Sequence, residues 1–259
     1  PEQDFENSRE LLKEIYQKIA RMEREGIDGI WSRIIKNGFA PIYMGEFDFV
    51  VGNPPWVRWG FLSEGYRKAT LDLWKDYGLF SLKGYEARLG GGEKDFSMLF
   101  TYACCDHYLK KQGKLGFLIT QTVFKAKGAG EGFRRFRLGN GDFLKITKAH
   151  DFVDLRPFED AMNLTAAVFI KKGEKTAYPI SYTLWRKKEG QVLSPEMSLP
   201  AIKARTQRFE LSAKPIGEDE ASPWQTAHER IMRILKRAKG KAAYKAFIGA
   251  RAEPYGIYW

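Results

Sequence analysis

The chain has 259 residues, and 44% of them are apolar, which is enough to bury a substantial core. It has no apolar run near the roughly 18 residues that cross a membrane and no signal-peptide pattern at its beginning, so we expect no membrane contact. The only cysteines are the adjacent Cys104 and Cys105, which rarely form a disulfide, so we expect a reducing cytoplasm. Lys and Arg number 43 against 32 Asp and Glu, and this formal charge of +11 favours polyanionic partners, nucleic acid first.

The beginning of the chain predicts two helices and a strand. Residues 7–25 place their apolar side chains on one helical face, and a second, shorter helix around residues 31–35 is expected to stop near Asn37 and Gly38. The apolar run EFDFVVG (46–52) then predicts a short strand. Because this run lacks alternation, we expect the strand to be covered on both faces.

The middle of the chain predicts alternating helices and strands. Residues 95–111 predict a long helix that ends at Gly113, and KLGFLIT (114–120) predicts a second buried strand. A Gly-rich turn and a short basic helix follow. Three further strands are expected at 143–152, 164–172 and, more exposed, 178–188. This order predicts an α/β fold, a partial doubly wound, Rossmann-like sheet with flanking helices whose last strands pair differently.

The end of the chain has a different composition. Residues 187–225 are rich in proline and read as a linker, and residues 226–239 predict a basic helix. We therefore divide the chain into a domain at 1–190 and a C-terminal helical linker region at 191–259.

Residues 53–56, Asn-Pro-Pro-Trp, directly follow the first predicted strand, where open parallel sheets bind ligands. The two prolines fix the backbone, so the carbonyl groups there point in set directions. Trp56 offers a flat surface on which a nucleobase can stack. Asn53 Oδ1 and a neighbouring carbonyl can accept both hydrogens of an exocyclic amine, which frees its lone pair to attack an electrophile. A rigid turn with a packed tryptophan is the alternative.

This stretch resembles the (Asn/Asp/Ser)-Pro-Pro-aromatic signature of amino-group DNA methyltransferases, especially the N6-adenine type. The stretch DFSMLFTYACCDHYLKKQGKLGFLIT is similar to the segment after that signature, and PFEDAMNLTAAVFIKKG to the segment that closes the target-base pocket, where Phe158 holds the position of an aromatic residue that touches the flipped base. The similarity covers residues 10–190 well and the tail loosely, where ARAEPYGIYW is similar to the point at which relatives pass into their target-recognition region, so we expect residues 191–259 to lead into a truncated target-recognition region. It is closest to large enzymes of restriction-modification or phage-defence systems.

The resemblance implies methyl transfer from S-adenosylmethionine to adenine N6 in DNA, with the base flipped out of the duplex. Asn53, Pro54, Pro55 and Trp56 are then the catalytic residues: Asn53 and the Pro54 carbonyl bind N6, Trp56 stacks on the ring, and Phe158 presses on its other side or edge. Catalysis rests mostly on positioning. Asn rather than Ser before the prolines favours adenine over cytosine N4 as a family tendency.

The resemblance also implies a cofactor site. Asp95 and Phe96 begin a helix near the expected cofactor and are candidate contacts, although a helix cap and a core residue explain them equally well. The family's Gly-rich cofactor loop has no counterpart in the residues before Asn53. We therefore expect the chain to lack an N-terminal cofactor-binding segment and to bind S-adenosylmethionine weakly or not at all by itself. A target-recognition domain and a nuclease domain are further expected partners, with DNA.

Several residues keep two interpretations. Arg134, Arg135 and Arg137 are candidate contacts to DNA phosphates or a solvated helix face. The run KGAGEG (127–132) is a candidate nucleotide loop or a flexible connection. The three histidines have no metal-ligand spacing, so no metal is expected. For the whole chain, the alternative to a methyltransferase piece is a non-catalytic nucleic-acid-binding fragment or subunit that needs a partner for cofactor binding.

Overall fold

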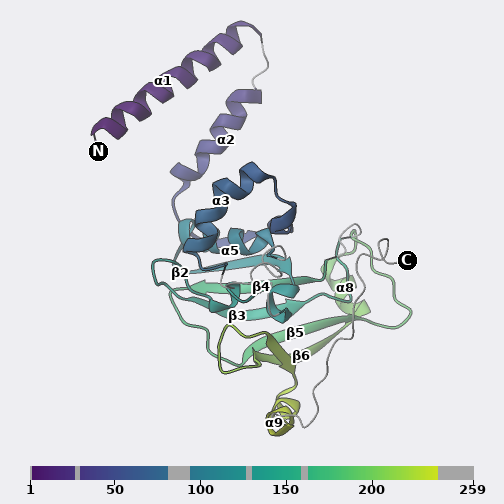
Figure 1. Ribbon diagram of the computed structural model, residues 1–259. Coiled ribbons are helices and arrows are strands. Elements are labelled where there is room, and N and C mark those ends of the chain that lie inside the picture. The colour runs from purple at the N-terminus through teal and green to yellow at the C-terminus, as the bar shows by residue number, and fades with distance from the viewer. Residues whose placement is uncertain (1, 27–29, 81–93, 127–129, 159–162, 239–259) are drawn as a thin grey trace, which may run out of the picture.

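A computed structural model describes residues 2–26, 30–80, 94–126, 130–158 and 163–238 of the protein (Figure 1). The helices in chain order are α1 (Glu2–Arg24), α2 (Ile30–Met44), η1 (Trp59–Phe61), α3 (Glu64–Asp76), α5 (Phe96–His107), α6 (Thr122–Lys125), η3 (Phe133–Arg135), α8 (Leu199–Arg205) and α9 (Glu229–Ala238). The strands are β1 (Phe47–Gly52), β2 (Leu109–Thr120), β3 (Leu144–Asp151), β4 (Thr165–Lys172), β5 (Ile180–Lys187), β6 (Thr206–Pro215) and β7 (Trp224–Ala227). The mixed α/β class expected from the sequence is confirmed.

One seven-stranded sheet organises the molecule, in the order β1-β2-β4-β3-β5-β6-β7. β1 is parallel to β2, and β3 is parallel to β5, whereas β4 runs antiparallel to both β2 and β3. β1, β2, β3 and β5 therefore all end at the same edge, which we call the carboxyl edge. The opposite edge, where these strands begin, is the amino edge.

One face of the sheet carries the core. Leu115, Phe117 and Ile119 of β2 are at most 5% exposed, and they pack with α5 and with aromatic residues from the chain around α3. Asp95 caps α5 by accepting a hydrogen bond from Ser97 N, and Ser63 caps α3 through Tyr66 N. These caps satisfy backbone donors that a helix leaves open at its start, so both helices begin where their side chains can cover the sheet.

The other face is open at β1, contrary to the expected burial of this strand on both sides. Phe49 is 71% exposed and Val51 is 83% exposed, and both line a shallow pocket with Phe169 of β4. β1 is the last strand at its end of the sheet, and no element of the described chain packs over this part of the face. The apolar run therefore predicted a strand correctly but not its surroundings.

Three element boundaries differ from expectation. α2 continues through Gly38 and Pro41 instead of stopping near Asn37, because one glycine costs about 1 kcal/mol relative to alanine and does not by itself end a helix. The long helix ends at His107, and β2 begins at Leu109, before Gly113. β5 is less exposed than expected: it pairs with β3 and β6, and four of its eight residues are buried.

The sheet also crosses residue 190, where we expected a linker. All of β5 pairs with β6, from Ile180 with Ala213 to Lys187 with Thr206. β7 pairs in turn with β6. Only the basic helix α9 fits the expectation for this region. Residues 187–225 are poor in long apolar runs because these strands lie far from the centre of the sheet. The expected target-recognition tail lies outside the described residues.

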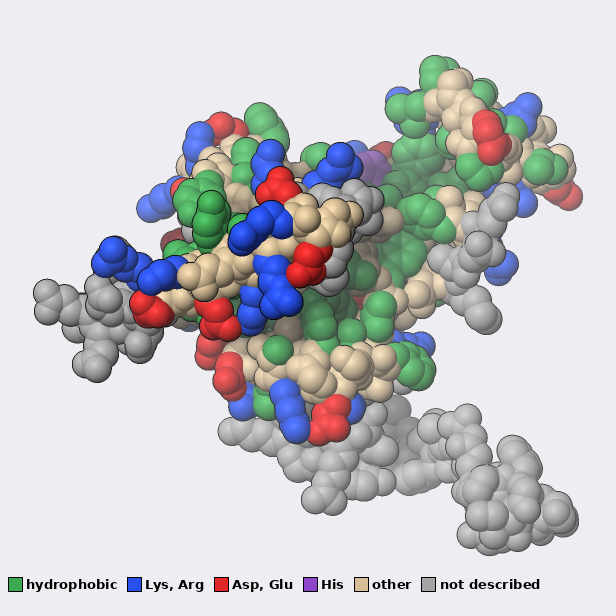
Figure 2. All heavy atoms as spheres, turned by 90° about the horizontal axis from the view of Figure 1, so that it is seen from above, with side chains coloured by type: hydrophobic (Ala, Val, Ile, Leu, Met, Phe, Trp, Pro, Cys, Tyr) green, Lys and Arg blue, Asp and Glu red, His purple; other side chains and the backbone are tan. Residues whose placement is uncertain are grey.

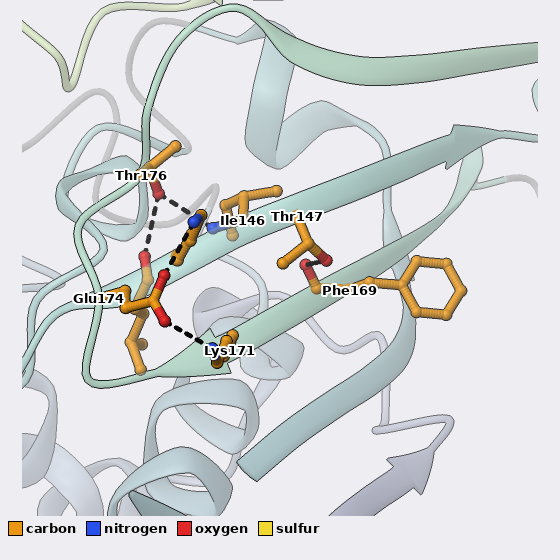
Figure 3. A network of polar contacts seen from close by, with 8 residues as sticks. Ile146, Thr147, Phe169, Lys171, Glu174 and Thr176 are labelled. Atoms are coloured by element: carbon orange, nitrogen blue, oxygen red, sulfur yellow. Dashed lines mark hydrogen bonds and ion pairs between the residues drawn. The ribbon is translucent and has the colours of Figure 1, made fainter. Parts of the chain in front are cut away.

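The amino edge is closed by polar contacts between β3, β4 and the turn after β4 (Figure 3). Glu174 accepts hydrogen bonds from Lys145 Nζ at 2.8 Å and Lys171 Nζ at 2.5 Å. Thr176 accepts from Ile146 N and donates to the Leu144 carbonyl. These contacts hold the turn against the sheet. In the described part of the chain, no helix is long and apolar enough to cross a membrane.

Candidate functional site

The Asn53 loop, residues 53–56, follows β1 at the carboxyl edge as predicted. Asn53 is exposed and makes no side-chain hydrogen bond to the part of the chain that the structure describes, while Pro54 is buried. Trp56 is partly buried, and its Nε1 donates to the Leu118 carbonyl of β2 at 3.2 Å. The buried proline and the bonded indole fix the loop, and the Asn53 carboxamide is left available to a ligand.

The chain after Trp56 is tied to the start of α5. Phe96 N donates to the Val57 carbonyl at 2.8 Å, and Trp59 N donates to the Lys94 carbonyl at 2.7 Å. Backbone bonds on both sides of Arg58 thus hold this segment as a short bridge to Asp95. The Asn53 loop is therefore supported from β2 on one side and from α5 on the other.

Phe158 lies beside Trp56, although the two residues are far apart in sequence. Their ring centroids are 5.3 Å apart, and the planes meet at 78°, an edge-to-face contact. A ring between two parallel aromatic faces needs a separation of about 7 Å, twice the van der Waals contact distance. The two rings therefore touch each other here and leave no slot between them.

The segment 152–158, which we call the Phe158 loop, is held at both neighbouring strands. Phe152 N donates to the Thr165 carbonyl of β4 at 2.9 Å, and Lys187 N at the end of β5 donates to Asp154 Oδ2 at 2.9 Å. Arg156, two residues before Phe158, has a φ of 43°, in the left-handed region that costs a non-glycine residue free energy. This backbone is thus held in a specific shape.

Asp151, the last residue of β3, is the centre of a buried polar cluster at the carboxyl edge. Its Oδ2 accepts from Gln121 Nε2 at 3.1 Å and from the Tyr182 hydroxyl, and its Oδ1 accepts from Val153 N at 3.0 Å. Lys125 Nζ lies 4.9 Å from the centre of the Tyr182 ring. Burial and the neighbouring Asp151 raise the pKa of Tyr182, so its hydroxyl remains a donor over the physiological range.

Sequence reasoning missed this cluster. Asp151, Gln121 and Tyr182 were read only as parts of strands and turns, and each is an ordinary residue in its own stretch of sequence. A signal existed for two of them: Asp151 ends β3 and Gln121 follows β2, so both lie at strand ends where open sheets place functional groups. Nothing local to β5 singles out Tyr182.

Asp95 and Phe96 lie near the Asn53 loop, but both have structural partners. The Asp95 carboxylate is 6% exposed and caps α5, and burial raises its pKa while the Ser97 bonds and Arg58 lower it. Phe96 packs its ring against Tyr66 and Phe100 in the core. These contacts agree with the cap and core interpretation that the sequence left open beside a cofactor contact.

Arg134 is placed where no phosphate contact is open to it. It is 1% exposed, and its guanidinium donates to the carbonyl oxygens of Val123 at 2.6 Å, Ala126 at 2.8 Å and Ala221 at 2.7 Å. Burial lowers its pKa to about 10, so it stays charged at neutral pH. The side chain thus joins the end of α6 to the turn before β7, which corrects the expected DNA contact for this residue.

Arg135 and Arg137 are exposed but lie far from the Asn53 loop. Arg137 forms a β-bridge with Phe143, just before β3 begins, and its guanidinium lies over the Phe143 ring. This position is at the amino edge, whereas the Asn53 loop is at the carboxyl edge. On the face shown in Figure 2, the described Lys and Arg side chains are interspersed with Asp and Glu.

The described glycines of KGAGEG have a packing role. A Cβ on Gly130 would lie 1.9 Å from the Val123 carbonyl oxygen, and one on Gly132 would lie 2.4 Å from the Gly78 carbonyl oxygen. Glycine is thus needed for the close approach of backbones around Arg134. Residues 127–129 lie outside the described chain.

A pocket of about 440 Å³ opens beside the Phe158 loop, on the open face of the sheet. Its lining is mainly apolar and includes Leu118, Phe152, Pro157 and Trp185, with Arg156 at the same site. Trp185 Nε1 donates to His150 Nδ1 at 3.0 Å, which fixes the imidazole as the tautomer protonated on Nε2. Leu118 connects this pocket to the Asn53 loop, since its carbonyl holds Trp56.

Comparison with known proteins gives two curated relatives. "Type II methyltransferase M.HincII" from Haemophilus influenzae is 29% identical over 126 residues, which are 44% of this chain and 20% of the relative. "Type II methyltransferase M.HindII" from Haemophilus influenzae strain KW20/Rd has the same identity and coverage. The chain thus spans about a fifth of the length of these relatives.

Comparison with solved structures gives two further proteins. One is a nuclease-deletion mutant of the Type ISP restriction-modification enzyme LlaGI in complex with a DNA substrate mimic, with a TM-score of 0.40 and 13% identity over 68% of this chain and 18% of that one. Another is a modification subunit of a putative type I restriction enzyme from Vibrio vulnificus YJ016, with a TM-score of 0.39 and 10% identity over 66% of this chain and 35% of that one.

The family model described as "Eco57I restriction-modification methylase" matches residues 2–158. This match includes α1 to β3, the Asn53 loop and Phe158, and it covers more than half of the chain. The protein therefore belongs to the Eco57I restriction-modification methylase family.

Proposed function

We propose that this chain is the base-holding part of an S-adenosylmethionine-dependent DNA methyltransferase that modifies adenine N6 in a restriction-modification system. The observation that carries the proposal is the exposed Asn53 carboxamide beside the fixed Trp56 ring, at the carboxyl edge of a sheet from this family. DNA is the substrate, and the adenine is flipped out of the duplex because its amino group is unreachable inside the stack.

The chain's own groups position the reacting amine. Asn53 Oδ1 and the Pro54 carbonyl accept the two hydrogens of N6, and the buried Pro54 keeps that carbonyl in place. With both hydrogens bound, the nitrogen lone pair is directed toward the methyl donor. This is catalysis by orientation, and it needs no strong general base.

Trp56 provides the stacking surface for the base. Its hydrogen bond to the Leu118 carbonyl holds the indole plane, and stacking of a base on such a ring stabilises binding by roughly 1–3 kcal/mol. The ring centroids of Phe158 and Trp56 are 5.3 Å apart, so the two rings are in contact. A base therefore reaches the Trp56 face on that side only when the Phe158 ring shifts. Phe158 then contacts the edge or the far side of the base.

The residues described here do not form a cradle for S-adenosylmethionine. Asp95 is a buried helix cap, and Phe96 is a core side chain. The space next to the described glycines near Arg134 is already occupied by packed backbone. When bound, the cofactor supplies the methyl group. We infer that its cradle belongs to another segment of a longer protein, as expected from the missing Gly-rich loop.

Exposed apolar surface supports such a segment. Phe49 and Val51 of β1 and Phe169 of β4 are between 40% and 83% exposed and line one pocket. An exposed apolar patch of this kind often marks a site where another segment or protein binds. Within the described residues, β1 pairs on one side only, with β2, and a further parallel strand fits on its other side.

Two measurements test the proposal. The chain is joined to the segment encoded before it and incubated with S-adenosylmethionine and unmethylated DNA, and the DNA is hydrolysed for mass spectrometry of its nucleosides. N6-methyldeoxyadenosine supports the proposal, N4-methyldeoxycytidine corrects the base, and tight DNA binding without methylated product favours a binding module instead. In parallel, calorimetric titration of the isolated chain with S-adenosylmethionine is expected to show no binding, and one-to-one binding would place the cradle in this chain.

A further inference from the structure

The Phe158 loop begins at a buried carboxylate whose partners come from the turn after β3, the turn after β2 and strand β5. Asp151 is 4% exposed, and one of its oxygens accepts from Val153 N, the second backbone amide of the turn. A carboxylate that bonds the amide two residues later shapes the turn that follows it. The first step of the loop away from β3 is therefore set by Asp151.

The second oxygen of Asp151 is held by β2 and β5. Gln121 directly follows β2, and Tyr182 lies within β5, opposite Ala149 of β3, and is 1% exposed, so the two donors reach Asp151 from different elements. Gln121 is itself fixed, because its backbone N donates to the Leu164 carbonyl at 2.7 Å. Because Gln121 and Tyr182 both donate to one oxygen, they hold the carboxylate of Asp151 in one orientation. Its other oxygen therefore stays directed at Val153 N.

The Phe158 loop brings Phe158 into contact with Trp56. The same loop contains Arg156, whose backbone is strained. A strained conformation persists only where surrounding contacts hold it. In the described chain, the start of the loop is held by the bond from Val153 N to Asp151, the Phe152–Thr165 backbone bond and the bond from Leu155 N to the Phe152 carbonyl, and its middle by the bond from Lys187 N to Asp154. Of these contacts, the Asp151 bond sets the first step away from β3, so we expect its loss to loosen the start of the loop and to shift Phe158.

We propose that Asp151 is a positioning residue for the target base, which acts by holding the Phe158 loop so that Phe158 faces Trp56, and that Tyr182 and Gln121 orient Asp151 for this role. The inference rests on the proposed function, since it assigns a purpose to the Phe158 position. Asp151 does not touch the base. It determines where the aromatic ring that does touch it is placed.

The test compares Tyr182→Phe and Asp151→Asn with Tyr102→Phe as a matched control. Tyr102 is also a fully buried tyrosine, and its hydroxyl donates to the Phe133 carbonyl at 2.6 Å, remote from the Phe158 loop. The first measurement is hydrogen exchange of the amides of residues 152–158 in the folded chain. We expect faster exchange in Tyr182→Phe and Asp151→Asn, and wild-type exchange in Tyr102→Phe.

The second measurement is methyl transfer by the same variants in the active form of the protein. We expect kcat with DNA to fall about 10-fold in Tyr182→Phe, as for a misplaced contact group, with the KM for S-adenosylmethionine unchanged. Tyr102→Phe is expected to keep the wild-type kcat. An active wild type in which Tyr182→Phe behaves like Tyr102→Phe in both measurements overturns the positioning role alone. A wild type without methyl transfer to any DNA overturns the proposed function, and this inference with it.

Discussion

The two edges of the sheet use similar residues for different purposes. At the carboxyl edge, Asn53 is exposed with its carboxamide unbonded within the described chain, next to a fixed Trp56. At the amino edge, Lys145 and Lys171 are paired with Glu174. The carboxyl edge thus has one polar side chain available to a ligand, Asn53, beside the bonded Asp151 cluster, whereas the amino-edge charges hold the fold.

This difference shows why charge alone did not locate the site. The basic stretch after KGAGEG was interpreted as a candidate phosphate-binding surface. Its first arginine, Arg134, instead donates hydrogen bonds to carbonyl oxygens at the end of α6 that have no partner within that helix. The loop with the functional signature carries no charge at all between Asn53 and Trp56. The following changes separate the two edges, from the largest expected effect to the smallest.

Asn53→Ala removes the carboxamide at the carboxyl edge. We expect methyl transfer by the active form to fall about 100- to 1,000-fold, as for loss of one fixed polar group at a reacting centre, while DNA affinity changes little. Single-turnover transfer and DNA titration measure the two quantities. The control Asn140→Ala removes another exposed asparagine, in the turn before β3, and keeps wild-type transfer. An equal loss of DNA binding in Asn53→Ala would favour the binding-module alternative.

Arg134→Met removes the buried guanidinium that joins α6 to the turn before β7. We expect the free energy of unfolding to fall by about 3 kcal/mol, because the buried carbonyls of Val123, Ala126 and Ala221 lose their donor. Chemical denaturation of the chain measures this. The neighbouring Arg135→Ala, at an exposed position, is expected to change it by less than about 0.5 kcal/mol. Equal effects of the two substitutions would contradict a structural role for Arg134.

Glu174→Gln tests the ion pairs at the amino edge. Hydrogen bonds from Lys145 and Lys171 lower the pKa of Glu174 from 4.5 to about 2. A lowered pKa stabilises the fold above the ordinary value, and this stabilisation is lost as the pH falls toward 2. We therefore expect a small decrease in Tm for Glu174→Gln at neutral pH that disappears between pH 4.5 and 2. A difference in Tm that is independent of pH would exclude the charge as its cause.

The double change Arg135→Ala with Arg137→Ala is expected to have the smallest effect. Both residues lie at the edge opposite the Asn53 loop, so DNA affinity of the active form should change less than about twofold. The slope of affinity against salt concentration should also stay constant, because no phosphate contact is lost. A slope reduced by about two would mean that DNA extends to the amino edge.

Much of the fold followed from local sequence. The periodicity of residues 7–25 predicted α1, and the apolar runs predicted β1, the later part of β2, and β3 to β5 at nearly their observed positions. The failures have a common cause. The open face of β1, the burial of β5 and the extension of the sheet through β6 and β7 all depend on which strand lies beside which, and pairing between distant segments leaves little trace in any one of them.

The sequence by itself determined the local chemistry of the site: two prolines restrict their own backbone, and a strand before them predicts a loop at the carboxyl edge. Only the tertiary structure decided that Phe158 meets Trp56, that Asp151 is held by Gln121 and Tyr182, and that Arg134 is buried. The physical reason is range. Backbone restriction acts within a few residues, whereas burial and side-chain hydrogen bonds depend on neighbours that only the folded sheet brings together.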